Sequence, residues 1–149
     1  MRTISLRYTD KFAPENGTIE EHVKIIREKG YVWYGKMGTP ISQKVSEMLM
    51  SNDEPCFLLI HSGAIERYWV YFNEISRERP EYEDFPTYYH SLADNCKSWF
   101  RVNRIEPAEK GVVGKCKVIS SGAVLSEASR HSMSPYFIIE FEETGGLNI

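Results

Sequence analysis

The sequence is poor in the patterns that most readily identify an enzyme or a metalloprotein. Its three cysteines, Cys56, Cys96 and Cys116, are far apart and form no CxxC pair or Cys/His cluster, which argues against a disulfide framework and a zinc site. It also has no glycine-rich phosphate loop and no nucleophile elbow. We therefore expect no cofactor, no metal and three ordinary buried or half-buried thiols.

Long apolar runs and an excess of positive charge are also missing. The longest apolar runs, such as residues 56–60, are far shorter than the ~20 residues of a membrane-spanning helix, and residues 1–4 lead into strand-like sequence without a signal-peptide core. These absences predict a cytoplasmic protein with no membrane partner. The net charge of −3 argues against tight, nonspecific binding to a nucleic-acid backbone.

The chain is long enough for one domain with a sizeable core. With 149 residues, of which 42% are hydrophobic, we expect a single domain over residues 1–149. Alternating or β-branched runs predict strands at residues 3–8, 31–37, 55–61, 68–75, 98–105, 114–119 and 135–141. Residues 62–64 are expected to form a hairpin turn, and residues 77–86 a solvated loop.

Helix signals occur between several of these strands. The capping box Thr18-x-x-Glu21 predicts the start of a helix that stops at Gly30. Ser42 is placed to cap a second helix over residues 43–50, and residues 88–92 favour a short helical turn. Residues 121–131 fit either a loop or a short helix.

The strands are too short and too crowded by turns for a doubly wound parallel sheet. We therefore predict an α+β fold in which a small, mostly antiparallel β-barrel is flanked by helices, because closure best removes exposed sheet edges. The interior is expected to take an alternating subset of Phe57, Leu59, Val70, Phe72, Val102, Phe137 and Ile139.

An aromatic residue beside a small or basic residue recurs at the strand ends. The run Trp33-Tyr34-Gly35-Lys36 is the clearest case, and Trp99 with Arg101 and Tyr136 after Ser134-Pro135 repeat it. This pattern indicates stacking and hydrogen bonding of a flat ligand rather than bond breaking. Trp33 and Trp99 fit either a pocket wall or the core, whereas the apolar neighbours of Trp69 indicate core.

Other polar residues also have two interpretations. Lys36, bracketed by Gly35 and Gly38, can meet a phosphate or sit in a solvated turn. Two Ser/Gly turns, Ser62-Gly63 and Ser120-Ser121-Gly122, can read polar base edges or be ordinary turns. His61 directly precedes Ser62, and strand neighbours point to opposite faces, so we expect no catalytic dyad there.

Several of these runs together resemble the EVE domains of the PUA-like superfamily, to which ASCH and YTH-like modules are related. They are WYGK after the first helix, FLLIHSG followed by YWVYF, SWFRV, and a late SSG before SPYFII, so that the resemblance spans roughly residues 30–141. It implies a pseudo-barrel of five or six strands with flanking helices. It also implies an aromatic-lined pocket that reads a modified base in DNA or RNA.

The resemblance places the implied base pocket on three strand ends. Its residues are Trp33, Tyr34, Gly35 and Lys36, then Ser62 and Gly63, then Trp99 with Arg101; Ser121 and Tyr136 complete the candidate site from two further strand ends. Two features depart from the pattern. The chain lacks the overall basic charge common in nucleic-acid readers, and the long loop at residues 78–84 (ERPEYED) is not part of the pattern.

We therefore predict a noncatalytic module that recognises a modified nucleobase or a nucleic acid containing one. The first alternative is an ASCH-like hydrolase of a modified nucleoside, with Lys36 acting beside a Ser or Glu. The second is a protein–protein interaction domain that presents the tyrosine-rich residues 82–89 and the acidic loop to a protein partner. Clustered Arg101, Arg104, Lys110, Lys115 and Lys117 predict a local basic face and a modest, salt-sensitive affinity for nucleic acid.

Overall fold

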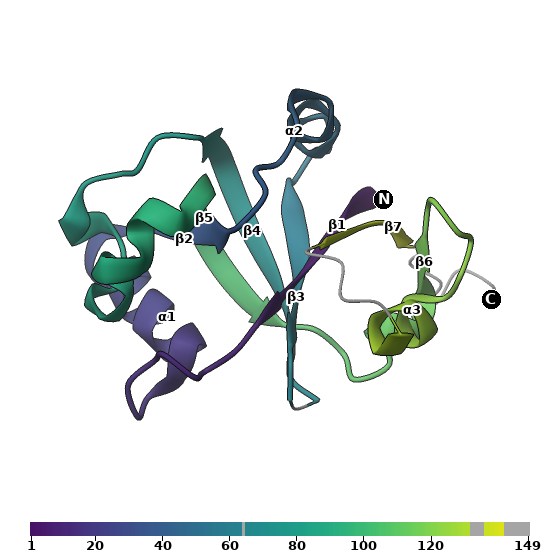
Figure 1. The fold of residues 1–149 in the computed structure, drawn as a ribbon, viewed down its shortest axis with the longest axis horizontal. Coiled ribbons are helices and arrows are strands. Elements are labelled where there is room, and N and C mark those ends of the chain that lie inside the picture. Colours follow the sequence, from purple (N-terminus) through teal and green to yellow (C-terminus); the bar gives the residue numbers. More distant parts are fainter. Residues whose placement is uncertain (64, 132–135, 142–149) are drawn as a thin grey trace.

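One seven-stranded sheet organises the chain in the computed structural model, which describes residues 1–63, 65–131 and 136–141 (Figure 1). Its strand order is β2-β5-β4-β3-β1-β7-β6, so β2 and β6 are the two edges. The strands are β1 (Arg2–Tyr8), β2 (Val32–Met37), β3 (Cys56–His61), β4 (Arg67–Ser76), β5 (Cys96–Pro107), β6 (Cys116–Val118) and β7 (Tyr136–Phe141). Every neighbouring pair is antiparallel except β1 with β3.

Two of the helices lie at the two ends of this sheet, and the third lies beside its central strands (Figure 1). They are α1 (Gly17–Lys29), α2 (Gln43–Met50) and α3 (Leu125–His131), with 3₁₀ segments η1 (Tyr82–Asp84), η2 (Thr87–Asn95) and η3 (Val112–Lys115). In Figure 1, α1 lies on the β2 side of the sheet and α3 on the β6 side. None of the helices in the described ranges has the length and apolarity needed to cross a bilayer.

The α+β class and the mostly antiparallel sheet are confirmed, but the closed barrel is wrong. Strand β1 pairs with β3 on one side, from Ser5 opposite Leu58 onward, and with β7 on the other, with Leu6 opposite Tyr136. Both edges of β1 are therefore used over much of its length. Strand β2 pairs only with β5 among the described strands, so it remains an edge strand, as β6 does at the other end of the sheet.

An open sheet has two faces, and β3 shows how the core divides between them. Phe57 and Leu59 point into one cluster of buried side chains, while Leu58 and Ile60 point into another, as the two-residue period of a strand requires. The expected interior residues follow this division. Phe57, Leu59, Val70, Phe72 and Val102 share the first cluster, whereas Ile139 lies in the second and Phe137 is only half-buried against it.

The start of α1 differs from the predicted capping box. Asn16 occupies the cap position without a side-chain hydrogen bond, and Thr18 lies inside the first turn. Asp10 supplies the missing acceptor, because its Oδ1 atom accepts from the Thr18 N–H at 2.9 Å. The predicted stop is confirmed: Gly30 has φ of 87° and donates its N–H to the Ile26 carbonyl at 2.7 Å.

The other local predictions are largely confirmed. Ser42 caps α2, and its Oγ atom accepts from the Val45 N–H at 3.1 Å. Residues 125–131 form the short helix α3, and residues 87–95 form η2. The predicted strand at residues 114–119 is shorter, because Gly114 and Lys115 belong to η3. Ser134 and Pro135, and part of the turn at residues 62–64, lie outside the described residues.

Candidate functional site

A hollow of about 190 Å³ lies between β1 and the edge strand β2. It is lined by Leu6, Arg7, Tyr8, Thr9, Phe12, Thr18, His22, Tyr34, Gly35, Lys36, Met37, Tyr88, Tyr89, Leu92 and Cys96. Sites for drug-sized ligands measure roughly 300–1,000 Å³. A smaller hollow with mostly apolar and aromatic walls suits one ring system.

Strand β2 supplies the side of the hollow that the sequence pattern predicted. Tyr34, Gly35 and Lys36 all line it. Gly35 lies opposite Trp99 in the β2–β5 pair, and a Cβ atom at Gly35 would come within 2.8 Å of both the Cys96 sulfur and the Trp99 ring. Only glycine therefore lets β2 approach these side chains so closely, and it leaves bare backbone at the hollow.

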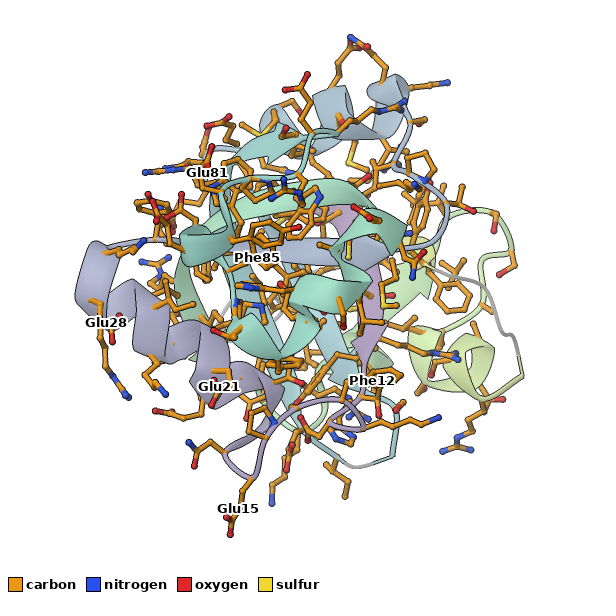
Figure 2. All side chains as sticks on the ribbon, turned by 60° about the vertical axis from the view of Figure 1, so that its left-hand side comes forward. Phe12, Glu15, Glu21, Glu28, Glu81 and Phe85 are labelled. Atoms are coloured by element: carbon orange, nitrogen blue, oxygen red, sulfur yellow. The ribbon has the colours of Figure 1, made fainter. Side chains whose placement is uncertain are left out.

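Aromatic side chains form most of the remaining wall. Tyr8 comes from β1, and Tyr88 and Tyr89 come from η2, where their rings meet edge to face at 5.0 Å. Phe12 reaches the hollow from the loop before α1 and is 50% exposed (Figure 2). The sequence prediction missed Phe12. Its signal was an aromatic residue inside a polar Pro/Gly loop, where burial gives no reason for one.

His22 fixes the position of Tyr89 at the back of the hollow. The Nδ1 atom of His22 is 2.8 Å from the Thr18 carbonyl, which can only accept, so Nδ1 carries the proton. Nε2 is then an acceptor and lies 3.2 Å from the Tyr89 hydroxyl. Burial lowers the pKa of His22 to about 4, so the ring is neutral at pH 7.

The hydroxyl of Tyr89 also contacts the β2 backbone. It accepts from the Gly35 N–H at 3.3 Å and lies 3.3 Å from the Trp33 carbonyl. His22, Tyr89 and β2 are thus joined in one buried network.

Lys36 places a nearly buried ammonium in the wall. Its side chain is 5% exposed, and Nζ donates to the Thr39 carbonyl at 2.6 Å and the Met37 carbonyl at 3.4 Å. Nζ also lies 5.2 Å from the centre of the Tyr136 ring. Burial lowers the pKa of Lys36, and burial raises the pKa of the neighbouring Cys96 thiol to about 11 although Lys36 acts in the opposite direction. The thiol is therefore protonated at pH 7.

A family model described as Pua-like matches residues 4–140, which include every residue that lines the hollow. The chain belongs to the Pua-like family. Comparison with curated proteins finds no match, and comparison with solved structures finds none either. The predicted superfamily is thus confirmed, while the narrower EVE assignment stays a prediction.

In this Pua-like chain the two predicted wall tryptophans lie behind the hollow. Trp33 and Trp99 belong to a third buried cluster, the η2 cluster, whose other members are Phe85, Tyr89, Ala93 and Cys96. Figure 2 labels Phe85. Trp99 is fully buried and stacks on Tyr89 at 6.2 Å with an interplanar angle of 14°. Neither tryptophan lines the hollow; both support Gly35 and Tyr89 from the far side.

The remaining predicted site residues are dispersed. Tyr136 approaches the hollow through its contact with Lys36. The Ser62 N–H donates to the Tyr8 carbonyl at 2.8 Å and the Gly63 N–H to His61 Nδ1 at 2.9 Å, so this turn abuts β1 without lining the hollow.

Two further predicted residues lie elsewhere. The Arg101 guanidinium stacks 4.1 Å from the centre of the Tyr31 ring and does not line the hollow. Ser121 is exposed in the turn after β6, at the other edge of the sheet from β2.

The basic residues of the expected basic face lie on β5 and around β6. Arg104 lies on β5 and pairs with Glu54 and Glu106, each at 3.1 Å. Lys115 and Lys117 lie at β6, near the opposite edge of the sheet, and Lys115 pairs with Glu109. Glu54 and Tyr71, which contact Arg104, line a second hollow together with Lys115, and both of these cations have carboxylate partners.

One group of potential metal ligands lies near the hollow. Ligand atoms of Asp10, His61 and Glu66 come within 4.8 Å of one another. His61 Nδ1 accepts from the Gly63 N–H, so Nε2 carries the proton and donates to Asp10 Oδ2 at 2.9 Å. Both ring nitrogens are engaged, and Asp10 also caps α1, so this group is a structural hydrogen-bond network.

Proposed function

We propose that this Pua-like protein is a noncatalytic module that binds a modified nucleobase in the hollow between β1 and β2. The supporting observation is the hollow itself, in which five aromatic side chains surround about 190 Å³ next to the bare backbone of Gly35. Stacking on such side chains stabilises a bound base by roughly 1–3 kcal/mol per contact. Within the family, an EVE-type reader of modified bases is the finer assignment that we propose.

The chemistry of the wall favours binding over hydrolysis. The Cys96 thiol is protonated, and both ring nitrogens of the neutral His22 are engaged by Thr18 and Tyr89. No Asp or Glu side chain of the described residues lines the hollow to act as a general base. A hydrolytic step at Lys36 would therefore lack a partner for proton transfer.

The surroundings favour recognition of the base over recognition of phosphate. The chain carries a net charge of −3, and two of the cations that were expected to attract a nucleic-acid backbone, Arg104 and Lys115, are paired with carboxylates. Both features weaken binding to phosphate groups. We propose that a nucleoside or free base binds as well as a base within a strand.

The alternative of a protein–protein module receives less support. Its proposed surface was the tyrosine-rich segment, but Phe85 and Tyr89 of that segment are buried in the η2 cluster. Tyr82, 48% exposed and covered by Arg79 at 4.0 Å, is the large aromatic side chain that this segment presents most openly.

A test of base binding uses Phe12→Ala, with Ile65→Ala as the control. Phe12 is exposed at the hollow, so its loss should weaken binding by roughly 1–3 kcal/mol and leave the free energy of unfolding nearly unchanged. Ile65 is 68% exposed in the β3–β4 turn and should have no effect on binding. Calorimetric titration with modified and plain nucleosides measures both variants. Full-strength binding by Phe12→Ala, or no binding of any nucleoside by the parent protein, would contradict the proposal.

A further inference from the structure

The charges that line the hollow are of one sign. Lys36 supplies that charge, and no carboxylate of the described residues lines the hollow; Arg7 also borders it, but its guanidinium donates to the Ser129 carbonyl and lies 5.9 Å from the centre of the Phe137 ring. The ionisable groups that remain there are neutral at pH 7: His22 is buried and hydrogen-bonded at both nitrogens, and burial raises the pKa values of the Cys96 thiol and of Tyr8, Tyr34, Tyr88 and Tyr89. A chain with a net charge of −3 thus places the Lys36 cation, and no carboxylate of the described residues, in the wall of its aromatic hollow.

Lys36 differs from the lysines on the surface. Lys29 and Lys115 have carboxylate partners, Asp84 and Glu109. Lys36 is more deeply buried, and within the described residues its ammonium has two carbonyl acceptors and an aromatic ring but no carboxylate. An ammonium has three N–H donors, so one remains beyond the two carbonyls. Burying a cation without a counter-charge is costly, and an anionic ligand would remove that cost.

We propose that the hollow binds a flat heterocycle bearing a negative charge on the ring, such as a ring carboxylate, with the anionic oxygen on Nζ of Lys36. This inference rests on the proposed function and specifies its ligand class. The heterocycle stacks among Tyr34, Tyr88 and Phe12, while Lys36 selects the charged substituent. The charge belongs to the ring rather than to a sugar phosphate, because Lys36 is nearly buried and the hollow has room for one ring system.

Two pairs of free bases, matched in shape but different in charge, separate the effect of the charge from that of the shape. The probes are 5-carboxyuracil against 5-methyluracil, and purine-6-carboxylate against 6-methylpurine, each titrated calorimetrically into the parent protein. Charge-assisted hydrogen bonds are stronger than neutral ones, so we expect the carboxylate of at least one pair to bind at least about tenfold more tightly. Lys36→Met, which keeps the length and apolar stem, should reduce this ratio to about one and retain the affinity for the methylated base.

The control is Lys97→Met on β5, an exposed lysine that donates to the Asp94 carbonyl, and it should keep the parent ratio. Lys36→Gln can still donate to the Thr39 carbonyl, so it serves as a second variant in case Lys36→Met does not fold. It should also lose the preference for the carboxylated base. A ratio of one or less in the parent protein for both pairs, or a parent-like ratio in both Lys36 variants, overturns the inference and leaves base binding intact. A larger Lys36→Met effect on uridine 5′-monophosphate than on 5-carboxyuracil also overturns it. No binding of any of the four bases overturns both the inference and the proposed function.

Discussion

His22 is the residue at which the fold and the hollow depend on each other most directly. It packs against Tyr34 and Tyr89, with ring centres 5.1 and 5.8 Å away, and its Nε2 atom faces the Tyr89 hydroxyl. A protonated His22 would bury an uncompensated charge and could no longer accept a hydrogen bond there. The neutral ring is therefore part of the folded state.

This dependence predicts a loss of stability in mild acid. The pKa of His22 is about 4 in the folded protein and about 6.5 when unfolded, so the unfolded chain binds more protons between these values. The contribution of the neutral His22 ring to the free energy of unfolding is complete above pH 6.5. It falls as the pH drops toward 4, by up to about 3 kcal/mol. Urea unfolding at pH 7 and pH 4.5 should show a smaller pH effect in His22→Phe than in the parent. Equal pH effects in the two proteins would show that His22 is not the titrating group.

Residue patterns predicted one wall of the hollow, but they could not separate the residues that line it from those that lie buried behind it. Tyr34, Gly35 and Lys36 were identified from their run on one strand, and all three line the hollow. Trp33 is adjacent to Tyr34, yet strand neighbours face opposite sides, and the face covered by η2 is decided by residues more than 50 positions away. Periodicity divides a strand into two faces, but it does not show which face meets a ligand.

At the scale of elements, α1 depends on a side chain outside the helix. Asp10 Oδ1 accepts from the Thr18 N–H at 2.9 Å, and its Oδ2 accepts from His61 at 2.9 Å, so one carboxylate joins the helix to the end of β3. The first turn of α1 carries Thr18 and, one turn on, His22 toward the hollow. Local sequence rules assign a cap to the residues next to a helix, so a cap eight positions upstream escaped them.

We expect Asp10→Ala to destabilise the protein by about 1–2 kcal/mol, because an N-terminal N–H of α1 loses its acceptor. Glu15→Ala is the control, since Glu15 is exposed in the same loop (Figure 2). Urea unfolding gives the free energies, and amide exchange at Thr18 reports the local effect. If the two variants were equally stable and Thr18 stayed protected, Asp10 would not be the cap of α1.

The strands themselves were predictable because their patterns are local. Alternating and β-branched runs predicted the ends of β1 to β5 to within about two residues. The buried run at β3 is apolar on both faces, as a central strand should be. The segment at residues 77–86 was less predictable. Its charges indicate a solvated loop, yet Phe85 is buried against Trp99 at 4.8 Å, because a single aromatic anchor outweighs its polar neighbours.

At the scale of the whole molecule, the pairing of β1 decides both the fold and the hollow. Because β1 pairs with β3 and β7, it is not available to pair with β2, and side chains from α1 and η2 line the hollow between β1 and β2. These pairings join residues more than 50 or 130 positions apart. No local pattern specifies them, which is why a closed barrel was predicted.

Mapping the ligand contacts on the protein surface tests the central claim, that the hollow between β1 and β2 is the binding site. Isotope-labelled protein is titrated with 5-carboxyuracil and with a panel of modified nucleosides, and the amide resonances are followed by NMR. Binding in the hollow should shift the amides of Thr9, Gly35, Lys36 and Leu92 and leave those of β6 and Ser121 unchanged. Shifts centred instead on a second hollow, which Trp69 and Tyr71 line, or no saturable shift with any of these ligands, would contradict the assignment of the hollow between β1 and β2 as the site.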